Sequence, residues 1–472
     1  MVKQGNEQKE VNIDKQRQNW AEEEFGNAEL GDQRLTKRLV ELAQQRGAKP
    51  NASIAESCGG WAGTQAAYRF YDNSQVTMEQ IQASHRKATV KRLAQHTIVL
   101  GVQDTTQVDL TNHPHTSGVG YLQDLKHSGF LLHTTLMVTA EREPLGLIQQ
   151  QVWVRDPADY GKRHQRHKRP TSEKESQKWL TSVGALSEVQ KEVPQTQLVS
   201  VGDSEADIYA LFAEAAELNQ PFLIRACRDR LILNEEERHL WQYIEQLPVA
   251  GTLEVAIPRQ AERPARVAIV GIRFAKVDLK VPSGEKDRLT SQDLTAWAIL
   301  AREESPSAEI PEPIEWRLLT NVPTASYDQA CERVHWYSCR WVVEMFHRVL
   351  KSGCRLEERQ FDDLENIQRF LAVDSVVAWR VLYLTLFSRE APNLPCEALL
   401  ETYEWQALYC FVHKTTRLPA QTPTLSEVTT WIARLGGFTA SSKHQPGSTV
   451  LWRGLNRLTD IAQAWLAFRP DP

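Results

Sequence analysis

The sequence predicts an α/β protein whose ends are helical and whose centre is rich in strands. Residues 20–82 carry apolar side chains at three- and four-residue spacing, which indicates helices. Residues 96–154 change to short apolar runs separated by turn residues, which indicates strands. Within residues 196–218, an apolar strand is followed by an acid and then by a helical pattern. A chain of 472 residues is long enough for two or three domains.

The bulk composition excludes several classes of protein. With 41% hydrophobic and 24% charged residues, the chain is ordinary for a globular protein and unlike a disordered one. It has no long uncharged apolar window, and the N-terminal stretch MVKQGNEQKEVNIDKQRQ is polar, so we expect no membrane association and a cytoplasmic location. The seven cysteines are scattered without a CxxC pair, which favours neither a disulfide framework nor a zinc site. A net charge of −5 gives no indication of nucleic-acid binding, so any such binding would depend on local basic patches.

The order of the elements can be read along the chain. Asp32 is a helix start signal, and the helix after it has a basic side. Three apolar runs between residues 96 and 156 have the spacing of an antiparallel meander. A later strand ends at Asp203, with a helix expected to begin near Ser204 or Glu205. Strand-rich, Pro-punctuated sequence fills residues 220–325. The rest is expected to be helical: one long helix over about 326–353, a second over 361–387, and helices from about 390.

The first long helix carries an unexpected polar stripe. Tyr337, Arg340, Glu344 and Lys351 fall within an arc of roughly 60° at about 100° per residue. Periodicity alone leaves three interpretations open: a solvated face, a structural ion pair between Arg340 and Glu344, or chemistry.

Three acids stand out by their positions. Asp104 and Asp203 end strands, and Glu344 lies on the helix with the polar stripe. Acids at the ends of apolar strands are costly to bring together unless cations neutralise them. Carboxylate oxygens suit Mg²⁺ or Mn²⁺, and two such ions clamp the attacking and leaving oxygens in phosphoryl transfer. With 60 acids in the chain, however, three at such positions also arise by chance.

The motifs together resemble a known family. The run Tyr337-x2-Arg340-x3-Glu344-x6-Lys351 matches the YREK signature of bacterial cut-and-paste DDE transposases of the insertion-sequence group. GVQDTTQV and VGDSEADIYA resemble the strands that carry the family's two Asp residues. ELGDQRLTKRLV and AAYRFYDN resemble its N-terminal DNA-binding module, and WIARLGGF resembles its C-terminal domain. The matches keep their order over nearly the whole chain.

The resemblance implies a fold, a set of partners and a reaction. It implies an RNase H-like mixed-sheet core at 81–375, with a β-rich insertion at about 220–325. A helical DNA-binding domain at 1–80 and a helical dimerisation domain at 376–472 would flank it. Asp104, Asp203 and Glu344 would bind two Mg²⁺ ions, with Mn²⁺ able to substitute. The enzyme would cut double-stranded transposon inverted-repeat ends through a hairpin and join them to target DNA, as a homodimer on the bacterial nucleoid.

The resemblance also assigns DNA contacts. Trp316 and Trp341 would stack on a flipped base. Phosphates would be bound by the following residues: Arg34, Arg38, Arg225, Tyr337, Arg340, His347, Arg348 and Lys351. Leu35 and Cys227 stand where the family has basic residues, and Arg228 and Arg230 offer replacement charge beside Cys227. The basic run GKRHQRHKRP at 161–170, with five Lys/Arg among ten residues, has no close counterpart in the family.

Three other functions stay open at this stage. They are a Mg²⁺-dependent nuclease without strand transfer, a regulatory DNA-binding relative without catalysis, and a helical scaffold with merely solvated acids. The intact acids and YREK positions disfavour the regulatory relative, and Trp316 with the insertion disfavours the plain nuclease. The scaffold would show no dependence on metal ions.

Overall fold

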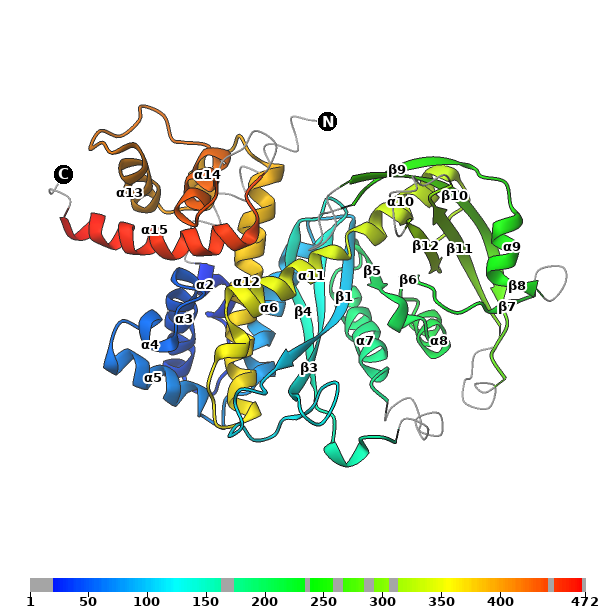
Figure 1. Ribbon diagram of the computed structural model, residues 1–472, viewed down its shortest axis with the longest axis horizontal. Coiled ribbons are helices and arrows are strands. Elements are labelled where there is room, and N and C mark those ends of the chain that lie inside the picture. Colours follow the sequence, from blue (N-terminus) through cyan, green and yellow to red (C-terminus); the bar gives the residue numbers. More distant parts are fainter. Residues whose placement is uncertain are drawn as a thin grey trace.

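The computed structural model describes residues 20–162, 174–233, 238–257, 266–283, 293–304, 313–439 and 445–468. Over these residues the predicted α/β class is confirmed: helical regions at both ends flank one 12-stranded mixed sheet. Figure 1 shows both terminal helical regions on one side of the molecule and the outer strands on the other.

From residue 20 onward, the described N-terminal region contains five helices: α2 (Trp20–Phe25), α3 (Gln33–Ala48), α4 (Ile54–Ser57), α5 (Trp61–Tyr71) and α6 (Met78–Leu93). The predicted start of α3 is confirmed, since the Asp32 side chain accepts a hydrogen bond from the Arg34 amide at 2.8 Å. Leu39 and Leu42 bury the apolar face of this helix. The basic side of α3 therefore stays toward solvent.

The predicted meander forms the first half of the sheet. Its strands are β1 (Ile98–Asp109), β2 (Gly120–Tyr121), β3 (Ser128–Thr139) and β4 (Pro144–Trp153), and β3 pairs antiparallel with the other three. Next to β1, β5 (Gln197–Gly202) and β6 (Phe222–Arg225) add in parallel. The central order is therefore β4-β3-β1-β5-β6.

The strands of the expected insertion continue this sheet. Strand β12 (Glu315–Thr320) pairs antiparallel with β6, and β11 (Leu294–Arg302), β10 (Arg266–Leu279) and β9 (Gly251–Ile257) follow. The short strands β7 (Leu231–Ile232) and β8 (Arg238–His239) and helix α9 (Leu240–Gln246) complete it. Strand β6, placed by the sequence within the insertion, belongs to the parallel part of the sheet.

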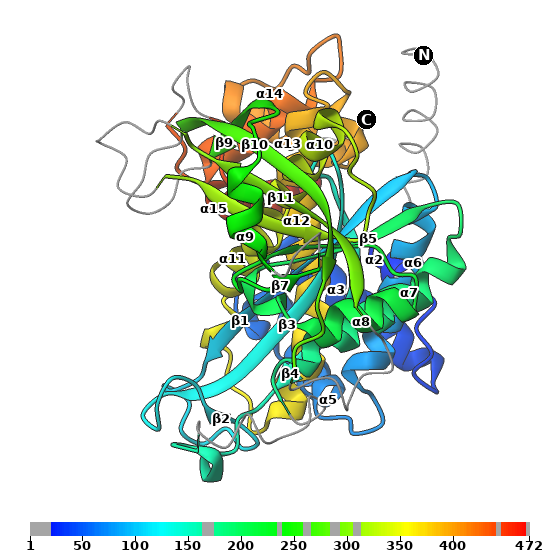
Figure 2. The same ribbon diagram turned by 90° about the vertical axis from the view of Figure 1, so that its right-hand side faces the viewer.

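Alternate residues of β1 face two different helical layers. Val99 packs with Leu186 of α7 (Gln177–Glu192) in one cluster. Leu100 and Val102 pack in another cluster with Phe346 of α11 (Trp341–Arg348). Helix α8 (Tyr209–Glu217) lies beside α7, as Figure 2 shows. Because side chains alternate along a strand, β1 presents its even-numbered residues to α11.

The prediction of one long helix over 326–353 is wrong in two places. Helix α10 (Tyr327–Ser338) stops at a turn formed by Cys339 and Arg340 before α11 begins. After α11 the chain widens into a π-helical turn, Val349–Gly353. Such turns shift the side chains that follow them and are frequent at functional sites. The stripe predicted from a regular helix therefore spans four segments, with Tyr337 in α10, Arg340 in the turn, Glu344 in α11 and Lys351 in the π-helical turn.

The long helix α12 (Leu364–Glu390) forms the centre of the molecule. It packs against α3, α5, α6 and β4 and leads into α13 (Thr402–His413), α14 (Leu425–Leu435) and α15 (Ser448–Phe468). By length and composition α12 qualifies as a membrane span, but 83% of its apolar window is buried inside the protein. The boundaries expected at residues 80 and 375 both fall inside continuous helices, α6 and α12.

Candidate active site and DNA interface

The sheet brings the first two acids to one place. Asp104 lies two residues beyond Val102, which pairs with Val201 of the parallel strand β5. Asp203 follows the end of β5, and its side chain accepts the Glu205 amide at 2.8 Å. Strand β1 continues to Asp109, so Asp104 lies within the strand and not at its end as the sequence predicted. The register of the two parallel strands still makes Asp104 and Asp203 neighbours, and the charge of Asp104 acts on Asp203. Asp104 also shares the α11-facing side of β1 with Val102.

Helix α11 brings the third acid to the same edge. Its apolar residues Val343 and Phe346 are fully buried in the main core, and the helix contacts β1 and β3. This packing leaves Glu344, on the same helix, half-buried beside β1. The sequence therefore predicted correctly that the apolar residues of this helix dock it on the sheet.

Arg340 lies between the acids. Its Nη2 is 2.6 Å from Glu344 Oε1, and its Nη1 is 3.8 Å from Asp104 Oδ1. The ion pair between Arg340 and Glu344 is thus present, as one of the three sequence interpretations expected. The Arg340 side chain is 11% exposed, and its guanidinium also contacts the Trp341 ring, with Cζ 5.7 Å from the ring centre.

The electrostatics indicate crowded carboxylates. Burial raises the pKa of Asp203 above its ordinary value, and the nearby charge of Asp104 raises it further while Arg340 lowers it. Burial likewise raises the pKa of Glu344, with Arg340 lowering it and Asp104 raising it. Burial alone would lower the pKa of Arg340, but Tyr337, Glu344 and Asp104 raise it. Burial, which Arg340 only partly offsets, therefore keeps the pKa values of Asp203 and Glu344 above their ordinary values.

His347 lies beneath the acids rather than on the surface. It is 5% exposed, its Nδ1 is 3.6 Å from Asp104 Oδ2, and its Nε2 is 3.1 Å from Thr134 Oγ1. Thr134 in turn accepts a hydrogen bond from Gln150. These contacts suit a side chain that orients Asp104. The DNA contact expected from the sequence would need the ring to become accessible.

Lys351 is engaged in the DNA-free molecule. Its Nζ donates to the Gln107 carbonyl at 2.8 Å and pairs with Glu357 at 2.8 Å. Glu357 also accepts the Asp109 amide at 3.0 Å. Glu357 could not be predicted from the helical period, because it lies beyond the π-helical turn, where that period carries no information. Its place near the end of β1 follows only from the fold.

The aromatic residues of the site are largely covered. Trp316 is 7% exposed and packs edge-on against Tyr337, with ring centres 5.2 Å apart at 72°. Tyr337 is 3% exposed. Trp341 is half-buried. Of these three side chains, Trp341 therefore offers the most surface to a base.

The expected basic contacts fall into two groups. Arg34, Arg225 and Arg348 are exposed. Arg38 is half-buried and pairs with Glu41 at 2.8 Å. The suggestion that Arg230 replaces the charge missing at position 227 is wrong, because that side chain is buried. The densest basic run, at 161–170, lies outside the described residues from position 163 onward.

The donor chemistry of the three acids fits a hard divalent cation, since all are carboxylates. Within the described parts of the chain, however, no three His, Cys, Asp or Glu side chains form a ready metal site. Arg340 occupies the space between two of them. The fit is therefore one of ligand type, and it requires the Arg340 guanidinium to leave Glu344.

Comparison with known families decides the identity of both ends. Residues 17–76 match the family described as "Transposase DNA-binding", and residues 376–466 match the "Transposase Tn5 dimerisation domain". The chain is a Tn5-type transposase. This transposase therefore carries a DNA-binding region on α2–α5 and a dimerisation region that begins within α12 and includes α13–α15.

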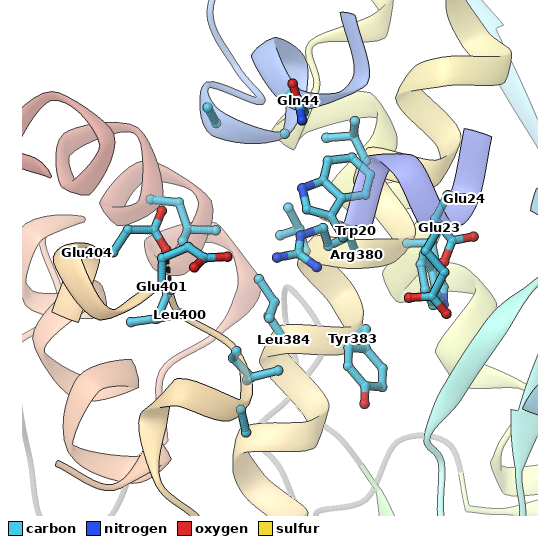
Figure 3. A pocket seen from close by; sticks show the side chains of 18 of the residues that line it. Trp20, Glu23, Glu24, Gln44, Arg380, Tyr383, Leu384, Leu400, Glu401 and Glu404 are labelled. Carbon is cyan, nitrogen blue, oxygen red and sulfur yellow. Dashed lines mark hydrogen bonds between the residues drawn. The ribbon is translucent and has the colours of Figure 1, made fainter. Parts of the chain in front are cut away.

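A cavity separates the two matched regions of the transposase. It measures about 980 Å³ and is lined by α2, α3, α6, α12, α13 and α15. Figure 3 shows Arg380 beside Trp20 on one wall and Glu401 and Glu404 on the other, and the Arg380 Cζ lies 4.9 Å from the Trp20 ring centre. Glu23 adds a further acid. So many acids make this cavity unsuitable for DNA phosphates.

Proposed function

We propose that this transposase cuts its transposon out of double-stranded DNA and inserts it elsewhere. The observation that carries the proposal is the convergence of Asp104, Asp203 and Glu344 around Arg340, in a chain whose ends match transposase DNA-binding and dimerisation domains. In this proposal the three carboxylates hold two Mg²⁺ ions, or Mn²⁺ in their place.

We also propose that the core is RNase H-like. The central strand order β4-β3-β1-β5-β6 supports this, with the first three strands antiparallel and the others parallel. Asp104 lies on β1, Asp203 directly follows the adjacent β5, and Glu344 lies on a helix across one face. Such a core would form the catalytic domain at 81–375, between the terminal domains at 1–80 and 376–472.

The chemistry is a series of in-line displacements at phosphorus. Divalent cations, when bound, supply the charge neutralisation that attacking and leaving oxygens need. A water attacks the phosphodiester at the transposon end and releases a 3′-OH. That hydroxyl attacks the opposite strand, releasing flanking DNA and closing a hairpin. Water reopens the hairpin, and the 3′-OH finally attacks a target phosphodiester.

The positive side chains of the site position the phosphates in these steps. Arg340 offers a planar fork for bidentate bonds to a phosphate, and Lys351 offers a point charge. Both are held by carboxylates in the DNA-free molecule, Arg340 by Glu344 and Lys351 by Glu357. DNA phosphate would replace those carboxylates. Arg348, and Arg34 and Arg38 on the basic face of α3, offer further positive charge for DNA phosphates.

A hairpin requires a base near the end to leave the stack, which costs a few kcal/mol. Stacking on an aromatic side chain recovers about 1–3 kcal/mol per base. We propose Trp316 and Trp341 for this role. Trp341 is the more accessible, and Trp316 becomes available if Tyr337 moves away from its ring.

The partners follow from the same proposal. They are inverted-repeat ends, target DNA and a second copy of the chain, which together form a synaptic complex in the bacterial cytoplasm, on the nucleoid. The predicted contact around Trp431–Phe438 is partly used within the chain, because Trp431 packs against Tyr409 and His413. Phe468, at the end of α15, is 85% exposed and extends the surface for a second copy.

The test is Mg²⁺-dependent cleavage of the inverted repeats that flank the gene. Wild-type protein should nick them, and Asp104→Asn, Asp203→Asn and Glu344→Gln should each bind the DNA but lose nicking by at least about 10³-fold. Glu303→Gln, at a partly buried ion pair with Arg266, is the control for a general loss of stability. Binding without cleavage by wild-type protein would leave only a regulatory role. Cleavage that survives all three substitutions would overturn the site.

A further inference from the structure

The turn after strand β6 is fastened to the segment after Asp203 by one buried carboxylate. Asp207 is 1% exposed, and its Oδ2 accepts the backbone amides of Cys227 and Arg228, each at 2.8 Å. The Cys227 thiol also donates to the Ser204 carbonyl at 3.4 Å. The two segments are therefore tied at three points.

The same carboxylate neutralises the buried Arg230. The Arg230 Nη2 lies 2.7 Å from Asp207 Oδ1, and the same nitrogen donates a hydrogen bond to the Asp207 backbone carbonyl at 3.1 Å. Two further nitrogens of this guanidinium, Nε and Nη1, are buried without a hydrogen-bond partner in the described structure. This is costly for a cation, so the pair is poor as a purely stabilising device. Arg230 acts on the turn and cannot reach DNA.

What the turn presents to solvent is basic. Arg225 and Arg228 are exposed on either side of Cys227, which is exposed as well. Arg225 also lies close to the Glu-bearing helix pair, since its charge, after that of Arg340, opposes the effect of burial on the Tyr337 pKa. Arg225, the last residue of β6, thus lies near the α10–α11 junction, and Arg228 lies on the turn that is held against the segment after Asp203.

We propose that Asp207 is a positioning residue that holds this turn against the Asp203 segment, so that Arg225 and Arg228 meet phosphates flanking the cut. The inference rests on the proposed function. The proposed role differs from a purely structural one because it depends on the two hydrogen bonds that Asp207 accepts from the backbone amides of the turn. The ion pair with Arg230 only makes the burial of Asp207 possible.

A matched pair of double variants separates the two roles. Asp207→Asn with Arg230→Leu removes the buried charges but keeps a carbonyl acceptor for the two amides. Asp207→Ala with Arg230→Leu removes the charges and the acceptor. Neither variant leaves a buried charge without a partner, so both should fold, and thermal unfolding checks this.

The readout is the salt dependence of binding to inverted-repeat DNA. Each phosphate contact contributes about 0.9 to the slope of log K against log salt concentration. The Ala variant should lose roughly 1–2 from the slope and nick at least about tenfold more slowly, because the turn is released. The Asn variant should keep the wild-type slope. Equal slopes and rates in the two variants would overturn the inference.

The exposed pair Arg225→Gln with Arg228→Gln gives the second arm without touching the core. This double variant should reduce the salt-dependence slope as Asp207→Ala with Arg230→Leu does. A quadruple variant that combines both pairs of substitutions should reduce the slope no further. Additive losses would also overturn the inference. Failure of the wild-type protein to bind inverted repeats would instead refute the proposed function, and the inference with it.

Discussion

A buried ion pair joins the DNA-binding region to the central helix. Arg46 on α3 and Asp374 on α12 both have side chains that are 0% exposed. Arg46 donates to both Asp374 oxygens, at 3.0 and 2.8 Å, and to the Pro50 carbonyl, the Ala52 carbonyl and Ser57 Oγ. A guanidinium has five N–H donors, so each of them has an acceptor here.

Replacing Arg46 by Met should therefore strongly destabilise the folded protein. It leaves the Asp374 carboxylate buried without a counter-ion, which costs about 3–5 kcal/mol. Adding Asp374→Leu removes the orphaned charge, and such charge-free replacements are often neutral or stabilising. The double variant should thus recover most of the loss.

Hydrogen exchange of the backbone amides in α3 and α12 is the assay. Since about 1.4 kcal/mol is a factor of ten, the Met variant should exchange these amides roughly 10²- to 10⁴-fold faster than wild type. End-DNA binding should weaken with it, because α3 carries Arg34 and Arg38. A double variant as unstable as Arg46→Met, or a single variant within about 1 kcal/mol of wild type, would refute the reasoning.

Three further predictions concern other parts of the molecule. Burial, and then the charge of Asp207, raises the pKa of the Cys227 thiol. The substitution Asp207→Asn should therefore lower that pKa and speed the labelling of this thiol by iodoacetamide at pH 8. An unchanged labelling rate would contradict the geometry. Burial alone would raise the pKa of Glu24, but Arg92 and His85 lower it to about 2. Above pH 4.5, Glu24 thus contributes on the order of 3 kcal/mol to the free energy of unfolding, and this contribution is lost as the pH falls toward 2. Between pH 5 and pH 3 the unfolding temperature of the Glu24→Gln variant should therefore fall less than that of wild type. Trp316→Ala should keep first-strand nicking but lose hairpin product on gels, and equal loss of both would mean that this Trp only packs.

Much of the fold followed from local patterns. The strands of the meander, the Asp32 cap of α3 and the apolar docking face of α11 are all encoded by short-range periodicity, which the structure keeps. The helix expected to begin near Ser204 starts later, because Ser204–Ala206 form a 3-10 turn and α8 begins only at Tyr209. The side chain of Asp207 is then committed to the turn at 227–228 rather than to the helix.

The site was harder to foresee, because its geometry depends on contacts distant in sequence. The break at Cys339–Arg340 turns Arg340 toward Asp104, 236 positions earlier in the chain as numbered. The burial of Arg230 and His347 depends on Asp207 and Thr134, each on another element. Residue type and spacing identified which side chains carry the charge, but only the packing decides which of them remain exposed to DNA.

The most direct test of the account is the form of the cleaved ends. Wild-type transposase, end DNA and Mg²⁺ should yield hairpin-capped transposon ends on a denaturing gel, followed by strands joined to target DNA, and Asp203→Asn should yield neither. Open nicks that never become hairpins would contradict cut-and-paste transposition by this route and would indicate a nuclease. Hairpins made equally well by Asp203→Asn would contradict the assignment of the active site.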